Sequence, residues 1–153
     1  MKLQKNSRLA LYSVLEFAAD PGRHIAASEI AEKYGVSPHH LAKVLSELAR
    51  AGVVESVRGV GGGYRFTGNA RRLTLHDVIR RFEEISPTEA ERREPGERTV
   101  AGHAIATVLS EIDEIALATF RSITIATMLR IVERQNGAAA NALRSPRASR
   151  PCR

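Results

Sequence analysis

The chain of 153 residues carries a formal net charge of +6, and 43% of its residues are hydrophobic, which excludes wholesale disorder and favours a small domain with an accessory element. No apolar run approaches the roughly 18 residues of a membrane span, so we expect a cytoplasmic protein without a membrane partner. Residues 1–72 carry 11 Lys and Arg against 6 Asp and Glu, whereas residues 73–135 carry 8 against 11. This basic first half indicates a polyanionic partner.

Three helices are expected in the first fifty residues. Apolar side chains recur at helical spacing over residues 7–19, and a Pro-Gly turn then ends that helix. A short helix is expected over residues 28–34. A third begins at Pro38 with Ser37 as its N-cap and ends at Gly52.

After Gly52 the hydrophobic period changes to that of strands. Residues 53–57 and 64–66 are expected to form a hairpin, with the glycine-rich residues 59–63 at its tip. Thr74 and Asp77 then have the spacing of a capping box and predict a helix through Phe82.

The second half of the chain is expected to contain a loop, two helices and a tail. Residues 84–98 are mostly polar and contain Pro87, Pro95 and Gly96, which is typical of a loop. Residues 99–135 predict a long amphipathic helix followed by a shorter C-terminal one. Residues 136–153 consist largely of Ala, Arg, Ser and Pro, and we expect a disordered basic tail.

Residues 27–46 have the pattern of a helix-turn-helix. Ala31 is small where the second helix crosses the first, and Gly35 lies in the turn, where a positive φ is needed. The first residues of such a second helix reach base edges in the major groove of DNA. The residues expected to contact DNA are therefore Ser37, His39, His40 and Lys43. The alternative is an ordinary helical hairpin with a polar face.

The glycine run after this motif favours DNA binding over nucleotide binding. Its spacing fits neither a dinucleotide-binding turn nor a phosphate-binding P-loop, and a strand follows it instead of a helix. A glycine hairpin after a helix-turn-helix is instead typical of a wing. Arg58 and Arg65 flank it, where they can meet phosphates or the minor groove. Gly61 is expected at the DNA surface, because a glycine brings the backbone close without side-chain collision.

Several segments resemble the IscR/NsrR/CymR (Rrf-two) family of bacterial winged-helix regulators, from residue 1 to about residue 132. They include Met1-Lys2-Leu3, Glu29-Ile30-Ala31, Leu41-Ala42-Lys43-Val44-Leu45 and residues 56–64, which read Ser-Val-Arg-Gly-Val-Gly-Gly-Gly-Tyr. The resemblance implies a mainly α fold with a small β-wing, made of a winged helix-turn-helix (residues 1–83) and a long dimerisation helix. It also implies a homodimer on a near-palindromic operator in double-stranded DNA, with Arg58 entering the minor groove.

The long helix independently predicts a homodimer. Its apolar stripe consists of Ile105, Val108, Leu109, Ile112, Ala116 and Phe120. A helix of roughly 20 residues is about 30 Å long, more than a domain built from residues 1–83 can cover. An uncovered apolar stripe of this size is most simply buried against a second copy.

The sequence differs from many members of this family in the residues that would bind a cofactor. Many members hold an iron–sulfur cluster on three cysteines in the loop before the dimer helix, but the single cysteine here, Cys152, lies in the tail. His103 falls near the last of those positions, and one imidazole cannot hold a cluster. We therefore expect no metal and no cofactor. If residues 86–98 gate DNA binding, the effector is a small molecule or a protein.

The sequence predicts a regulator and no enzyme. We find no catalytic triad in a supporting context, no zinc-protease motif and no phosphate loop. The expected function is sequence-specific DNA binding by a cluster-free transcriptional repressor. The alternative is a protein-interaction module, in which docking of an enzyme or another protein is the main activity.

Overall fold

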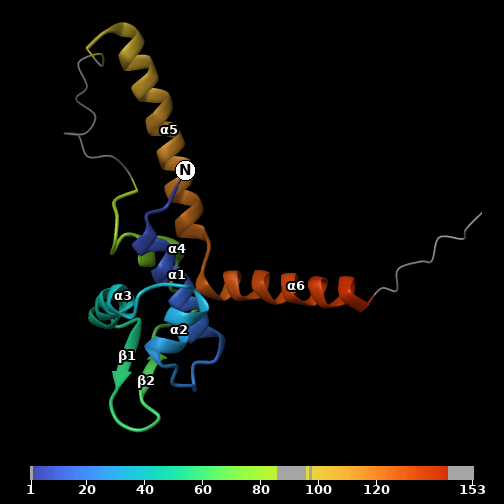
Figure 1. The fold of residues 1–153 in the computed structure, drawn as a ribbon. Coiled ribbons are helices and arrows are strands. Elements are labelled where there is room, and N and C mark those ends of the chain that lie inside the picture. The colour runs from blue at the N-terminus through green and yellow to red at the C-terminus, as the bar shows by residue number, and fades with distance from the viewer. Residues whose placement is uncertain (1, 86–95, 97, 145–153) are drawn as a thin grey trace, which may run out of the picture.

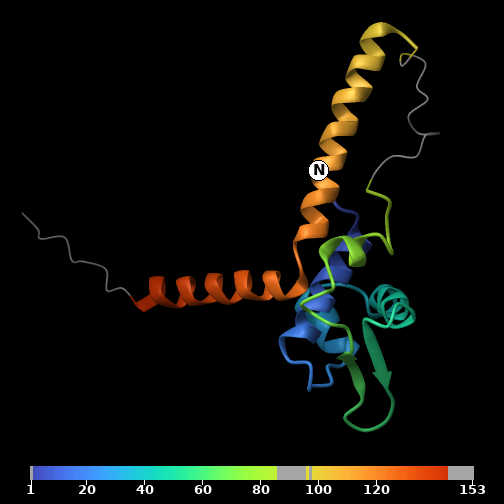
Figure 2. The ribbon, with the colours of Figure 1, turned by 180° about the vertical axis from the view of Figure 1, so that it is seen from behind.

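The structure is a computed structural model that describes residues 2–85, 96 and 98–144 (Figure 1). Its elements are α1 (Lys5–Ala19), α2 (Ala27–Lys33), α3 (Pro38–Arg50), β1 (Val54–Val57), β2 (Gly63–Phe66), α4 (Leu75–Ile79), α5 (Val100–Ser122) and α6 (Ile125–Arg144). The first four helices and the sheet form one body, from which α5 and α6 extend in different directions (Figures 1 and 2). This confirms the expected mainly helical architecture with one small antiparallel sheet. None of the described helices combines the length and the apolar character needed to cross a membrane.

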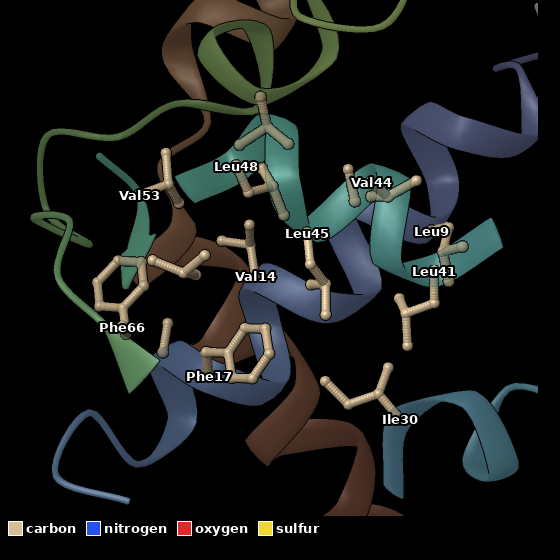
Figure 3. Packing of buried hydrophobic residues seen from close by; sticks show 14 of the residues in the cluster. Leu9, Val14, Phe17, Ile30, Leu41, Val44, Leu45, Leu48, Val53 and Phe66 are labelled. Carbon is tan, nitrogen blue, oxygen red and sulfur yellow. The ribbon is translucent and has the colours of Figure 1, made fainter. Parts of the chain in front are cut away.

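The core of the body is mostly aliphatic. Helices α1 and α3 contribute about half of it, and Figure 3 shows their side chains meeting: Leu9, Val14, Phe17, Leu41, Val44, Leu45 and Leu48. Full burial of one such Leu side chain stabilises the fold by roughly 1.5–3 kcal/mol. The spacing of these residues gives α3 one buried face and leaves its opposite face open to solvent.

The hairpin is joined by an isolated β-bridge from Ile25, which was not expected from the sequence. Val57 pairs with Gly63, so the tip consists of residues 58–62, one residue earlier than expected. Ile25 also pairs with Tyr64 through two backbone hydrogen bonds, each with an N···O distance of 2.9 Å. This pairing fastens the base of the wing to the segment between α1 and α2.

Helix α4 begins as predicted but is shorter than expected. Its first turn has the full capping box between Thr74 and Asp77. The helix was expected to continue through Phe82, whereas it ends at Ile79. The physical reason is that the N–H groups of Arg81 and Phe82 bond to carbonyls three residues back, which tightens the last turn.

The capping box makes the stability of the protein depend on pH. The Asp77 carboxylate accepts hydrogen bonds from the backbone N–H of Thr74 (3.1 Å) and from its hydroxyl (2.8 Å). Burial raises the pKa of Asp77, but these hydrogen bonds, together with the charges of Arg80 and His76, outweigh burial and hold the pKa below its ordinary value. A lowered folded-state pKa means that the carboxylate stabilises the fold above its unfolded pKa of about 3.9. That stabilisation is lost as the pH falls through the folded-state pKa.

Asp77→Ala is therefore expected to lower the free energy of unfolding by about 1 kcal/mol at pH 7, and by less at pH 3. Urea unfolding at both pH values measures the difference. Glu32→Ala is the matched control, because the Glu32 side chain is exposed and only its backbone takes part in capping a helix. It should change stability by no more than about 0.5 kcal/mol. An equal loss for Asp77→Ala at both pH values would contradict the role of the carboxylate.

The junction between α5 and α6 is fastened to the body. The Leu75 N–H donates to the Ile123 carbonyl (2.9 Å), and the Ile125 N–H donates to the Leu73 carbonyl (2.8 Å). The Ile125 side chain is fully buried. In contrast, no residue of α5 is buried. Helix α5 therefore projects from a fixed base.

The prediction of a disordered tail is wrong for residues 136–144. Helix α6 continues through Gly137 to Arg144. The physical reason is composition, because Ala has the highest helix propensity and a single Gly inside a helix costs only about 1 kcal/mol. The remaining tail, including Cys152, and most of the loop of residues 84–98 lie outside the described residues.

Candidate nucleic-acid interface

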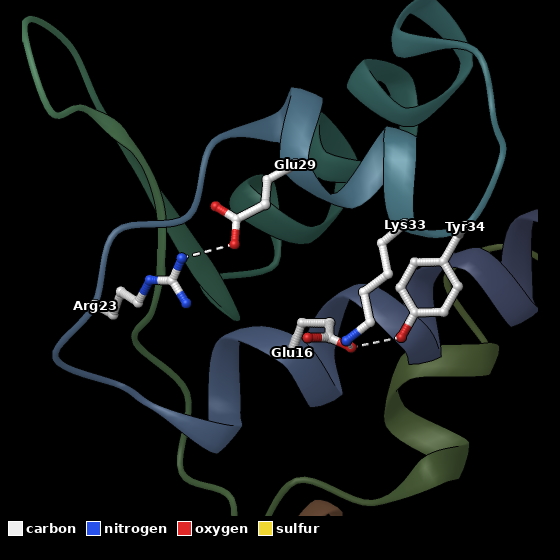
Figure 4. A network of polar contacts seen from close by, with 5 residues as sticks. All are labelled: Glu16, Arg23, Glu29, Lys33 and Tyr34. Carbon is white, nitrogen blue, oxygen red and sulfur yellow. Dashed lines mark hydrogen bonds and ion pairs between the residues drawn. The ribbon is translucent and has the colours of Figure 1, made fainter.

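Helix α2 is held in place by polar contacts on both sides (Figure 4). The Glu16 carboxylate of α1 accepts hydrogen bonds from Lys33 Nζ and Tyr34 Oη, both at 2.6 Å. Burial raises the pKa of Glu16, but the bonds from Lys33 and Tyr34, together with the charges of Lys33 and Arg23, outweigh it and leave the pKa below its ordinary value. Arg23 Nη2 pairs with Glu29 at 2.6 Å, across from this cluster. These contacts orient the first helix of the helix-turn-helix.

The turn between α2 and α3 follows from its sequence. Gly35 has a φ of +60°, as predicted, and its N–H donates to the Glu32 carbonyl (3.2 Å). The Val36 N–H donates to the Ala31 carbonyl (3.0 Å). Together these two bonds form a Schellman motif, which satisfies the last carbonyls of α2 and directs the chain into α3.

The N-cap and the first two turns of α3 present three of the predicted DNA contacts. The Ser37 hydroxyl accepts a hydrogen bond from the His40 N–H (3.1 Å), and Pro38 occupies the first helical position. Ser37, His39 and Lys43 are exposed. A shallow depression runs along this open face and is lined by His39, Ala42, Lys43, Ser46, Glu47 and Arg50.

His40 lies differently from its neighbour. It follows His39 by about 100° around the helix and sits on the flank of the open face, where it is half-buried. Its Nε2 atom is buried and has no hydrogen-bond partner within the described part of the chain. A base contact by this imidazole would require the side chain to turn outward, so His40 is a weaker candidate than His39 or Lys43.

Ion pairs neutralise two arginines near this face. Arg50 pairs with Glu47 one turn earlier in α3. Arg65 of β2 pairs with Glu55, which stands directly opposite it in β1. Glu55 is not among the residues predicted from the sequence, because only the register of the hairpin reveals its position opposite Arg65. In the unbound protein the Arg65 guanidinium therefore already forms an ion pair with the Glu55 carboxylate.

The wing tip places Arg58 in solvent. Arg58 and Gly61 are both exposed, and Gly61 has a φ of +74°. No ion pair among the residues that the structure describes involves Arg58 or Lys43. These two exposed cations are therefore available on the candidate interface. That pattern suits contact with a polyanion.

The predicted dimer stripe on α5 is open over most of its length. Ile105, Val108, Leu109 and Ile112 are between 55% and 62% exposed. Ala116 is half-buried, and Phe120 packs against the core of its own chain. The open stripe therefore ends before Phe120, where the body begins to cover the helix.

Metal ligands are not assembled in the described part of the chain. No group of three or more His, Cys, Asp or Glu side chains there is placed to hold a metal ion. His103 is exposed at the start of α5. The chain has one cysteine, so the thiolates that an iron–sulfur cluster requires are missing from the sequence itself.

Comparison with known proteins decides the family. The model of the Rrf2 family, described as an iron-dependent transcriptional regulator, matches residues 3–131. The chain belongs to the Rrf2 family. The winged-helix resemblance found in the sequence is thereby confirmed.

Individual relatives of this Rrf2 protein agree. It is 47% identical over 133 residues to a Rhodopseudomonas palustris protein named as the HTH-type transcriptional regulator BadM, covering 87% of this chain and 84% of that one. The structure of CymR, the global cysteine regulator of B. subtilis, is 28% identical with a TM-score of 0.67, covering 86% of this chain and 98% of that one. T. potens IscR is 26% identical with a TM-score of 0.65, covering 88% and 90%.

The Rrf2 chain is thus a DNA-binding transcriptional regulator and not an enzyme, as the sequence predicts. Its family model carries the description iron-dependent, whereas the ligand set of this chain does not fit an iron–sulfur cluster. No step of its function is therefore assigned to such a cluster.

Proposed function

We propose that this Rrf2 regulator binds a near-palindromic operator as a homodimer, with α3 in the major groove and the wing against the minor groove. The observation that carries the proposal is that Lys43 on α3 and Arg58 on the wing tip are exposed and make no ion pair within the described residues. A cation on α3 can read base edges, whereas one on a wing contacts phosphates or the minor groove. Ser37 and His39 lie beside Lys43 and complete the base-reading surface.

The homodimer is supported by the open stripe on α5. Four large aliphatic side chains along it are more than half exposed, and α5 extends away from the body (Figure 1). A two-fold partner covers such a stripe with an identical one. Two recognition helices related by that axis require two half-sites of inverted sequence, so the operator is a near-palindrome.

Regulation is proposed to proceed without an iron–sulfur cluster. One thiol per chain supplies two per dimer, fewer than the ligands that a cluster needs. A small molecule or a protein is therefore the effector, acting by shifting the spacing of the two recognition helices. Repression is the proposed mode, because a dimer bound across promoter DNA blocks access to it.

The test is a mobility shift of the protein, as purified and without added metal, on the DNA upstream of its own gene. We expect binding roughly 10³-fold tighter than to a scrambled duplex of equal length. The protein should be colourless, without stoichiometric iron. Anaerobic reconstitution with iron and sulfide should change neither its absorbance nor its affinity.

Two outcomes would contradict the proposal in different ways. A visible absorption band that follows both bound iron and DNA affinity would overturn the cluster-free mode. Equal affinity for the upstream DNA and the scrambled duplex would overturn operator binding. That second result would favour the protein-interaction module.

A further inference from the structure

Val60 is an apolar side chain held in solvent at the wing tip. Its relative exposure is 111%, so nothing in its own chain covers it. The other large hydrophobic side chains exposed in the described ranges all lie on helices. Val60 is therefore set apart from the dimer stripe, and the fold does not use it for packing.

The backbone that presents Val60 does not depend on its side chain. Gly59 and Gly61 on either side have φ values of +106° and +74°. The Gly62 N–H donates to the Gly59 carbonyl (3.0 Å), and a Cβ atom at Gly62 would lie 2.3 Å from the Val57 carbonyl oxygen. The turn is thus specified by glycines and a hydrogen bond. A polar residue at position 60 would satisfy the fold equally well.

The chemistry of the tip matches the minor groove of DNA. Arg58 lies two residues before Val60, so one short turn presents a cation and a compact apolar group. The minor groove is only about 6 Å wide, and proteins that bind it combine cations with apolar side chains at base steps. A β-branched side chain has few rotamers, so it loses little entropy on contact.

We propose that Val60 contacts the floor and sugar walls of the minor groove beside Arg58 and selects A·T base pairs there. The reason is the guanine N2 amino group, which projects into the minor groove only at G·C pairs. An apolar side chain against that group would remove water from a donor without replacing its hydrogen bond. The inference rests on the proposed operator binding and adds a specificity determinant to it.

A protein partner fits this feature less well. Stable protein interfaces bury more than about 1,000 Å² with several apolar anchors, whereas the wing tip offers one apolar side chain between glycines. A narrow groove that closes around a single side chain suits it better. The test must therefore distinguish docking of a protein at the wing tip from contact of Val60 with DNA.

The test compares wild-type protein with Val60→Ser on the operator and on duplexes whose wing-contacted A·T pairs are changed to G·C. We expect Val60→Ser to weaken operator binding about three- to tenfold. The variant loses the free energy that the wild-type protein gains by burying part of the Val side chain against DNA. The preference for A·T over G·C at those pairs should shrink by the same factor. The salt dependence should stay unchanged, because no phosphate contact is lost.

Val100→Ser is the matched control, since Val100 is also largely exposed but lies at the start of α5, far along the chain from the wing. It should bind and discriminate as wild-type does. If wild-type itself does not prefer the operator, the proposed function and this inference both fail. If wild-type prefers the operator and Val60→Ser keeps the same affinity and A·T preference, only this inference fails. That result would favour protein docking as the role of the wing tip.

Discussion

Replacing Ile112 by Glu is expected to leave the protein folded but monomeric at micromolar concentration. Ile112 is 55% exposed in the single chain, so the charge is tolerated there. In the proposed dimer the same carboxylate would be buried against the partner's apolar stripe, where losing its hydration costs free energy. The loss of simultaneous binding to two half-sites should weaken operator affinity about 10²-fold or more. Sedimentation velocity and a mobility shift measure the two effects.

Ala118→Glu is the matched control for this dimer prediction. Ala118 is exposed on the same helix but lies about 120° around it from Ile112, outside the stripe. This variant should remain dimeric and bind the operator normally. A dimeric Ile112→Glu protein would show that another surface joins the two copies.

Lys43→Ala and Arg58→Ala are both expected to weaken operator binding, but in different ways. Lys43 projects from the open face of α3, so its loss should cost about tenfold at the correct site and relax discrimination between sites. Arg58 lies on the wing tip, so its loss should weaken all sequences alike and reduce the salt slope by about 1. Titrations at several salt concentrations, on operator and scrambled duplexes, separate the two behaviours.

Glu55→Gln provides a control of opposite sign for the wing. Glu55 pairs with Arg65 across the hairpin, so its removal should free one cation. Binding to all sequences should strengthen, and the salt slope should rise by about 1. Unchanged affinity in both Lys43→Ala and Arg58→Ala would remove the proposed docking geometry.

Signals within a few residues were sufficient to predict most of the helix-turn-helix and its boundaries. Ser37 followed by Pro38 predicted the start of α3, and the spacing of Thr74 and Asp77 predicted the capping box. Gly35 predicted the turn. These predictions were correct because an N-cap, a capping box and a positive φ involve only neighbours along the chain.

The predicted ends of α6 and α4 were wrong, because at both ends the free energies of continuing and of stopping the helix are nearly equal. Residues 136–144 are rich in Ala, and the low cost of Gly137 lets α6 continue where a tail was expected. Helix α4 ends early because its last amide groups find carbonyls three residues back. Differences of about 1 kcal/mol decide such ends, and periodicity does not measure them.

Only the tertiary structure decided which side chains are available to DNA. Arg65 and Arg58 look alike in the sequence, yet Arg65 is paired with Glu55 and Arg58 is not paired within the described residues. His39 and His40 are adjacent, yet the Nε2 atom of His40 is buried. The physical reason is that pairing and burial depend on groups that strand register and helix packing bring together from distant parts of the chain. No local pattern carries that information.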